Sequence, residues 1–530
     1  MKRKVCSILL SIAVGSVLVA GCGSTSSNSS SASSTAPSTG SATTEASDAE
    51  ASEATTTTTE TTAAATDEEP YEVKMLVPIP NETPSEAAMT KVTQAINDLT
   101  LPALNMTLDF EVVPFSTYTD QVNLALSSGE KLDILAAPSA YCPTWVNSGY
   151  LNDMTELLDQ YGQDILSSYA SEAVATSPQV NGFIYGVPVH KEDCMQTTWF
   201  ARTDLIEKYN IDTSQIHTIA DIDKIYETVA AGEPGIWVEA VERDGRPKTV
   251  QYDGLGGTVH AVIVDPANNT KVQSLYETDG FKEWCEYHHK WFENGWINSG
   301  SASDTESYYS YIKSGQAFSF FSDYGHPLSE ADQEKNCGGV DLTMVTLNPP
   351  IASTQSAAVF CYTIPSGSEN PEKAMQMLNF LMTNTDAMNI LNWGIEGEDY
   401  VINSDGLADY PDGKDASSVD YHLGAGWILP NQFKCTPWVT DGADIYQKIQ
   451  DYNGTAVESK AMGFTFDPIN VTDQMAAVKN VSDQYYNALS CGAVDPDEYI
   501  PKMIEETNDA GMQDIVNEIQ TQLDAFLAQK

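Results

Sequence analysis

Apolar and polar residues alternate where the chain first shows a regular pattern. Residues 71–77 (YEVKMLV) have the alternation of a β-strand, and residues 78–84 are rich in Pro, Asn, Glu and Thr, which predicts a loop. A helix is predicted from about residue 85. Its apolar side chains recur three or four positions apart, at Met89, Val92, Ile96 and Leu99.

The alternation of strand and helix continues beyond this helix. The pattern predicts a strand over 108–113, a helix over 118–126 and a buried strand over 132–138. A β-α-β-α-β order predicts an α/β fold with a mostly parallel sheet and helices on both faces. Ligands bind such sheets beyond the carboxyl ends of the strands, which favours the loops after Val77 and Ala137.

The N-terminus has the composition of an exported protein. Lys2, Arg3 and Lys4 precede an apolar stretch over residues 5–20, and the word VAGC ends at Cys22. This arrangement predicts a secretory signal peptide over residues 1–21. A cut before a cysteine resembles the lipobox of bacterial lipoproteins, in which the thiol of Cys22 would carry the lipid. A plain signal peptide with a chance cysteine is the alternative.

The following stretch is predicted to be a spacer. Residues 23–70 contain Ser, Thr, Ala and acidic residues, with no Lys or Arg. Such a composition buries too little apolar surface to offset the entropy of ordering, so residues 22–70 are interpreted as a disordered linker.

The charge of the chain excludes some partners. The 530 residues include 75 acidic and 26 basic ones, a formal charge of −49. Nucleic acid and anionic lipid surfaces require basic patches, so neither is expected as a partner. Beyond the signal peptide no apolar run is long enough to span a bilayer, which leaves lipid as the expected membrane attachment.

The cysteines do not form a recognisable framework. Seven remain after Cys6 and Cys22, at irregular spacing and without a C-x-x-C motif: Cys142, Cys194, Cys285, Cys337, Cys361, Cys435 and Cys491. An odd number of this kind favours buried thiols, with some pairing left open.

Six phrases in fixed order carry a family resemblance. They are residues 149–158 (GYLNDMTELL), 181–188 (NGFIYGVP), 199–206 (WFARTDLI), 371–381 (PEKAMQMLNFL), 392–400 (NWGIEGEDY) and 511–520 (GMQDIVNEIQ). Together they resemble the extracellular solute-binding proteins of family 1, the maltose-binding-protein-like receptors of ABC importers, in a Gram-positive lipoprotein branch. Residues 231–258 depart from this family and are interpreted as an insertion.

The resemblance implies a hinged fold of two lobes (class II) with C-terminal helices and the ligand between the lobes. It assigns residues 71–188 and 355–385 to lobe 1, and residues 189–354 and 386–530 to lobe 2. It also implies a monomer on the outer face of the cell membrane that passes a solute to an ABC permease, without catalysis, cofactor or metal. A carbohydrate or oligosaccharide is the expected solute, although peptides and other solutes are known for relatives.

A sugar site needs flat aromatic rings with polar groups at their edges. Trp393, beside Gly394 and Glu396, is the strongest aromatic candidate. The complete set of expected ligand-binding residues is Asn81, Tyr141, Trp145, Trp199, Asp323, Tyr324, Trp393, Glu396 and Trp427. For each aromatic residue, packing in a core is an equally good interpretation, and for the polar residues a solvated surface is.

Enzyme motifs were weighed against this interpretation. His190-Lys191-Glu192 lacks the P-C-x-x-C of a zinc deaminase, and His288-His289 with Glu293 lacks the H-E-x-x-H spacing. No G-x-S-x-G or P-loop occurs. The carboxylate pair of a glycan hydrolase is defined in space, so a lipid-anchored hydrolase remains an alternative, as does a surface adhesin.

Overall fold

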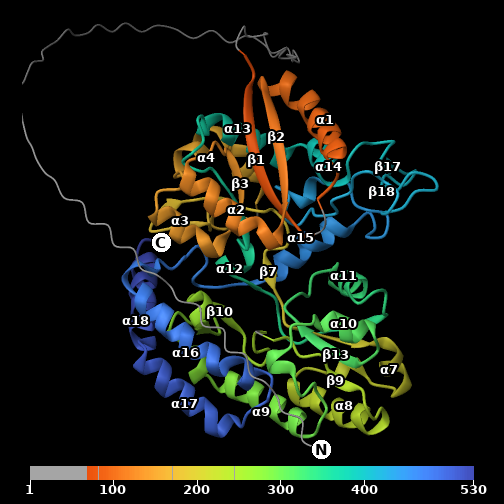
Figure 1. The fold of residues 1–530 in the computed structure, drawn as a ribbon, viewed down its shortest axis with the longest axis vertical. Coiled ribbons are helices and arrows are strands. Elements are labelled where there is room, and N and C mark those ends of the chain that lie inside the picture. The colour runs from red at the N-terminus through yellow and green to blue at the C-terminus, as the bar shows by residue number, and fades with distance from the viewer. Residues whose placement is uncertain (1–68, 81–82, 170, 244) are drawn as a thin grey trace, which may run out of the picture. The chain divides into compact units, whose positions relative to one another are not determined.

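A computed structural model describes residues 69–80, 83–169, 171–243 and 245–530 of the chain (Figure 1). The predicted signal peptide, Cys22, the linker up to residue 68 and Asn81 lie outside these residues. The first sheet has the strand order β2-β1-β3-β16-β6. Its strands are β1 (Tyr71–Ile79), β2 (Met106–Pro114), β3 (Ile134–Pro138), β16 (Phe360–Thr363) and β6 (Val187–Pro188).

The predicted parallel arrangement is confirmed in this sheet. Strand β1 pairs in parallel with β2 and β3, whereas β16 runs antiparallel to β3 and β6. Alternate residues of β1 enter opposite cores. Val73, Met75 and Val77 pack under α1 (Glu86–Leu104) and α13 (Pro371–Thr383), and Leu76 faces α2 (Phe115–Ser128). The period of two in the sequence therefore becomes two covered faces.

The second sheet has the strand order β14-β8-β13-β9 and belongs to a separate core. Trp199 on β8 packs against α8 and α9, whereas its neighbour Phe200 packs on the opposite face with Phe320 and α10. The elements concerned are β8 (Thr198–Arg202), β9 (Trp237–Glu239), β13 (Ala317–Ser322), β14 (Leu342–Thr346), α8 (Ile219–Gly232), α9 (Asp279–Glu293), α10 (Tyr308–Lys313) and α11 (Ser329–Asn336).

Three short strands form a sheet of their own between these two parts of the chain. Its order is β19-β15-β7, with β7 (Cys194–Met195), β15 (Ile351–Ala352) and β19 (Val457–Glu458). Each lies where the chain passes from one large core to another. The two crossings expected near residues 188 and 357 are thus accompanied by a third, close to residue 457.

The chain ends in three helices that pack on α9 and on a small sheet, β10-β11-β12 (Figure 1). Apolar residues of the last helix share a core with β11 and β12. The elements are α16 (Thr472–Ser490), α17 (Pro496–Asp509), α18 (Met512–Leu527), β10 (Tyr252–Gly254), β11 (Ala261–Val264) and β12 (Val272–Ser274).

One of the expected lobe boundaries needs correction. Residues 386–530 were assigned to lobe 2, but most buried apolar side chains from Ala387 to Trp438 belong to the core of the first sheet. Helix α14 (Thr385–Trp393), for example, packs on α1 and α13. The physical reason is that α14 continues almost directly from α13, so its apolar face is buried on the same layer. The part that packs with the second half begins near Ala461.

Shorter elements complete the described chain. The remaining helices are α3 (Cys142–Asn147), α4 (Thr155–Tyr161), α5 (Gln163–Ser168), α6 (Glu172–Ala175), α7 (Thr203–Lys208), α12 (Thr354–Ala357), α14 (Thr385–Trp393) and α15 (Ile445–Thr455). The remaining strands are β4 (Gln179–Val180), β5 (Phe183–Ile184), β17 (Val401–Ile402) and β18 (Ala408–Asp409). None of the helices among the described residues combines the length and apolar character of a membrane span.

All seven remaining cysteines are buried. Cys142 and Cys361 have their Sγ atoms 3.9 Å apart. A disulfide bond is about 2.05 Å long, so this pair is not bonded.

Candidate functional site

Three aromatic rings meet at the edge of the first sheet where its parallel strands end. Helix α2 begins at Phe115, directly after β2, and Phe360 begins β16 opposite Pro138, the last residue of β3. The ring of Phe115 stacks on Trp427, with centroids 6.0 Å apart and planes 19° apart, and lies 5.8 Å from Phe360. Phe115 is 36% exposed and Trp427 37% exposed. This edge cluster (Phe115, Phe360 and Trp427) therefore presents an apolar surface to solvent.

Tyr141 lies at the same edge, in the 3-10 turn that follows β3. It is 44% exposed and stacks on Trp145, with centroids 5.8 Å apart. Trp145 itself is buried, and its Nε1 donates to Oδ1 of Asn123 at 3.0 Å. Of this predicted pair, Tyr141 offers a surface and Trp145 supports it from below.

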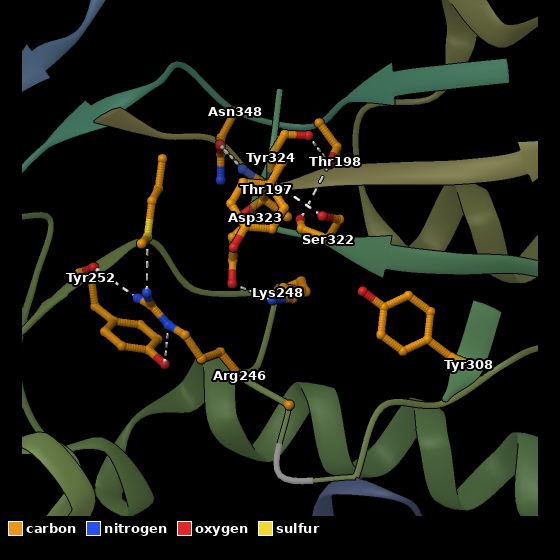
Figure 2. Close-up of polar contacts among 12 residues, drawn as sticks. Thr197, Thr198, Arg246, Lys248, Tyr252, Tyr308, Ser322, Asp323, Tyr324 and Asn348 are labelled. Atoms are coloured by element: carbon orange, nitrogen blue, oxygen red, sulfur yellow. Dashed lines mark hydrogen bonds and ion pairs between the residues drawn. The ribbon is translucent and has the colours of Figure 1, made fainter. Parts of the chain in front are cut away.

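A charged cluster (Arg246, Lys248, Asp323 and Tyr324) lies at the end of β13 in the second sheet, where Asp323 and Tyr324 directly follow the strand. Nζ of Lys248 lies 2.6 Å from Oδ2 of Asp323, and the side chain of Lys248 is almost fully buried (Figure 2). Burial alone disfavours the carboxylate, but the ammonium of Lys248 and the guanidinium of Arg246 hold the pKa of Asp323 below its usual value. Asp323 therefore stays ionised at neutral pH and accepts hydrogen bonds.

Arg246 is held by an aromatic ring. Its Nε donates to Oη of Tyr252 at 3.1 Å, and its guanidinium lies 4.4 Å from the centre of that ring (Figure 2). Pro247 follows directly and restricts the backbone of Arg246 to extended conformations. A cavity of about 30 Å³ lined by Arg246, Asp323 and Gln196 has room for about one water-sized group.

Tyr324 is the exposed member of the charged cluster. It is 48% exposed, while its backbone is fixed because its carbonyl accepts from Oγ1 of Thr198 at 2.8 Å. Partial burial and the neighbouring Asp323 carboxylate raise the pKa of Tyr324 to about 12. The phenol therefore keeps its proton and combines a ring face with a hydrogen-bond donor.

The chain itself limits the distance between the two clusters. The amide of Val189 donates to the carbonyl of Phe360 at 3.1 Å, and the amide of Gln196 donates to the carbonyl of Asp323 at 3.0 Å. Val189 and Gln196 are seven residues apart, which spans at most about 25 Å in a fully extended chain. An elongated ligand can bridge that distance.

Two predicted tryptophans have no open face. Trp199 is fully buried, and its Nε1 donates to Oη of Tyr226 at 3.1 Å. Trp393 is 7% exposed, packs on Trp438, and donates from Nε1 to the carbonyl of Thr436 at 3.1 Å. Both serve core packing in this structure, which is the other interpretation of each aromatic candidate, and neither offers a face to a ligand.

Glu396 is exposed, but its phrase forms a turn. The carboxylate of Asp399 accepts from the amides of Ile395 and Tyr421. Gly394 has φ +95°, and a Cβ there would lie 2.5 Å from Oδ2 of Asp399. The conspicuous GIEG word is thus accounted for by backbone geometry.

Sequence reasoning missed four residues of this arrangement: Phe115, Phe360, Arg246 and Lys248. Arg246 and Lys248 were missed because they lie in the stretch 231–258, which departs from the family. They did leave a signal, since two basic residues so close together are uncommon in a chain with 26 basic residues among 530. Phe115 follows the second strand, whose end belongs to the same sheet edge as the two loops that were considered. The pair of basic residues and the position of Phe115 after a strand can both be read from the sequence.

The described residues contain no group of three or more His, Cys, Asp or Glu side chains that could hold a metal ion. The side chains of the two clusters can stack on a ligand and form hydrogen bonds with it. Aromatic faces suit the apolar faces of sugar rings, and a carboxylate, an ammonium and a phenol suit hydroxyl groups.

A family model described as "Bacterial extracellular solute-binding protein" matches residues 94–395, which is more than half of the chain. The chain belongs to this family. The resemblance inferred from the sequence phrases is thereby confirmed. A second model, for a domain of unknown function (DUF3502), matches residues 460–528.

Two relatives match this chain over more than half of their own length. A carbohydrate ABC transporter substrate-binding protein of Streptococcus pneumoniae is 28% identical over 438 residues, 80% of this chain and 85% of the relative. Lipoprotein LipO of Bacillus subtilis is 24% identical over 320 residues, 55% of this chain and 61% of the relative.

The N-glycan transport solute binding protein NgtS of Streptococcus pneumoniae has a similar fold. Its crystal structure matches with a TM-score of 0.75 at 24% identity, over 86% of this chain and 99% of NgtS. Its complex with Man1GlcNAc matches with a TM-score of 0.69 at 25% identity, over 86% and 99%. The expected two-lobe α/β fold is thereby confirmed.

Proposed function

We propose that this protein is an extracellular substrate-binding protein that captures a carbohydrate, most simply an oligosaccharide, and delivers it to an ABC permease. The observation that carries the proposal is the edge cluster, where Phe115 and Trp427 are stacked and still more than a third exposed. Sugar-binding relatives of similar fold, including NgtS in complex with Man1GlcNAc, support the choice of ligand.

Binding in this proposal divides the ligand between the two clusters. Apolar faces of sugar rings stack on Trp427 and Tyr141, while hydroxyl groups donate to Asp323 and accept from Tyr324. The three crossing strands β7, β15 and β19 act as the hinge. Closure around the ligand then presents a changed surface to the permease.

We further propose that Cys22 carries a lipid and that residues 23–70 tether the folded part to the outer face of the membrane. The similarity to lipoprotein LipO supports this assignment. In a lipoprotein-processing host, Cys22→Ala releases the protein into the medium, whereas the wild type stays with the membrane fraction. Equal release of both proteins would contradict the anchor.

A titration distinguishes binding from hydrolysis. Purified protein is titrated with Man5GlcNAc, kestose and a dipeptide by calorimetry, and the mixtures are then incubated and separated by chromatography. Saturable binding of an oligosaccharide without product supports the proposal. Conversion of the oligosaccharide to shorter products would instead establish a glycan hydrolase, and binding of the dipeptide alone would change the ligand class.

A further inference from the structure

The chain segment that carries Arg246 and Lys248 is attached at both of its ends to the C-terminal part of the chain. We define the cationic segment as residues 245–253 and the C-terminal segment as residues 459–530. Oη of Tyr486 donates to the carbonyl of Gly245 at 3.0 Å, and Oγ of Ser459 donates to Oδ2 of Asp253 at 2.7 Å. Two hydroxyl groups of the C-terminal segment thus hold the first and last residues of the cationic segment.

Tyr486 is itself rigidly placed. It is buried on α16, and its ring stacks on Phe281 with centroids 5.9 Å apart and planes 17° apart. His260 contacts the same ring edge-on, with centroids 4.5 Å apart. Because the ring is packed on two sides, the direction of its hydroxyl group is fixed.

The middle of the cationic segment is clamped against α9. The hydroxyl of Thr249 donates to the carbonyl of Gly280, and a Cβ on Gly280 would lie 2.4 Å from Cβ of Val250. Helix α9 is in turn bound to the C-terminal segment, since Nε1 of Trp284 donates to the carbonyl of Ser490 at 3.1 Å. The C-terminal segment therefore supports the cationic segment directly and through α9.

We propose that the C-terminal segment, matched by a domain family of unknown function, is a positioning element that sets ligand affinity without touching the ligand. Tyr252 and Asp323 hold the side chains of Arg246 and Lys248 in place before the ligand arrives. A backbone fixed by the C-terminal segment keeps them there, so this part of the site does not have to be ordered on binding. Tyr486 and Ser459 are the positioning residues. The inference rests on the proposed function, in which the charged cluster binds the ligand.

The test removes one hydroxyl at a time. Tyr486→Phe keeps the ring contacts and loses only the bond to Gly245, and Ser459→Ala is the independent variant at the other end. Tyr485→Phe is the matched control, because the neighbouring phenol bonds Glu506 within the C-terminal segment. Affinity for the oligosaccharide that binds in the panel, Man5GlcNAc or kestose, is measured by calorimetry well below the melting temperature.

The expected result is a loss of affinity of about twofold to tenfold in Tyr486→Phe and Ser459→Ala, with no change in Tyr485→Phe. A Lys248→Met background distinguishes positioning from general loosening. There Tyr486→Phe has a smaller effect on affinity than in the wild type, because part of its effect acts through Lys248. A purely structural role would give additive losses instead.

Two outcomes separate this inference from the proposed function. If Lys248→Met binds the oligosaccharide as the wild type does, the charged cluster is not part of the ligand site and the proposed site fails. If Lys248→Met binds weakly while Tyr486→Phe and Ser459→Ala both bind as tightly as Tyr485→Phe, the ligand site stands and the positioning role is overturned.

Discussion

Trp427 and Trp393 have different surroundings, since Trp393 belongs to the core of the first sheet and Trp427 lies at the edge of that sheet. Trp393 is enclosed by Trp438 and His422 and has its Nε1 bonded to a backbone carbonyl. Trp427 stacks on Phe115 and remains 37% exposed. A side chain with an open aromatic face can gain contact area from a ligand, whereas an enclosed one already has its contacts.

Replacement of Trp427 by Ala should therefore weaken binding without unfolding the protein. Loss of a stacking contact of about 1.4 kcal/mol lowers oligosaccharide affinity by about tenfold. The matched variant is Trp393→Ala, which leaves a cavity and lowers the free energy of unfolding by about 3–5 kcal/mol. Calorimetry and urea unfolding measure the two effects. If Trp427→Ala lowers the free energy of unfolding but leaves the affinity unchanged, Trp427 is not part of the site.

His190 gives a pH dependence of stability with a definite sign. Burial between Tyr169 and Phe433, together with the nearby charge of Lys434, lowers the pKa of His190 to about 4. In the unfolded chain histidine titrates near its ordinary value of about 6.5. Between these values the unfolded state binds a proton that the folded state does not, so stability falls as pH falls through this window.

His190→Phe removes this titration and keeps an aromatic ring in the same place. The free energy of unfolding is measured with urea at pH 7, 6 and 5 for both proteins. As pH falls, the free energy of unfolding should decrease more in the wild type than in His190→Phe. Curves that stay parallel over this range would contradict the lowered pKa.

At the scale of elements, Gly280 shows how a helix and a loop segment are fitted together. Its missing Cβ lets α9 approach Val250 closely. Gly280→Ala should lower the free energy of unfolding by about 1–3 kcal/mol, because the added carbon overpacks this contact. It should also weaken oligosaccharide binding, since Val250 lies two residues from Lys248.

The control for this prediction is another helical glycine. A Cβ at Gly454 on α15 would meet no atom within 4 Å. Gly454→Ala should therefore raise stability by about 0.5–1 kcal/mol, as expected from helix propensity alone. Thermal or urea unfolding of both variants checks the contrast. Stabilisation of Gly280→Ala would show that the cationic segment is free to move away from α9.

The first three strands and two helices could be predicted because their apolar periodicity is local. The expected helix from residue 85 begins at Glu86, where Ser85 caps it. No helix was predicted for residues 385–393, and nothing local in the sequence states which sheet the apolar face of such a helix covers. That information lies in the packing of α14 on α1, some 300 residues away in the chain.

The candidate site was less predictable for a similar reason. Tyr141, Asp323, Tyr324 and Trp427 could be selected because they follow strands or flank glycines, which is a sequence property. The exclusion of Trp199 needed the knowledge of which face of β8 is covered by α8 and α9. Arg246 and Lys248 act beside Asp323 only because residues 245–253 are held against the end of β13, a contact between distant segments.

At the scale of the whole molecule, the proposed hinge connects binding with transport through the crossing strands. Residues 189–196 touch the edge cluster at one end and the charged cluster at the other. A ligand held by both clusters favours the arrangement of the crossing strands in which it can contact the edge cluster and the charged cluster at the same time. The free energy available for this shift is the difference in affinity between the two arrangements.

Small-angle scattering tests this closure. The radius of gyration of the wild-type chain should fall when saturating oligosaccharide is added, whereas Trp427→Ala at the same ligand concentration should show a smaller change. Residues 1–68 are identical in the two proteins, so the comparison reports the effect of Trp427. Ligand that binds the native state alone also raises stability by about 2.7 kcal/mol at one hundred times Kd, which thermal melting records independently. A melting shift without any decrease in the radius of gyration would mean that the solute binds to a rigid body, and the hinge would have to be abandoned while the ligand assignment stood.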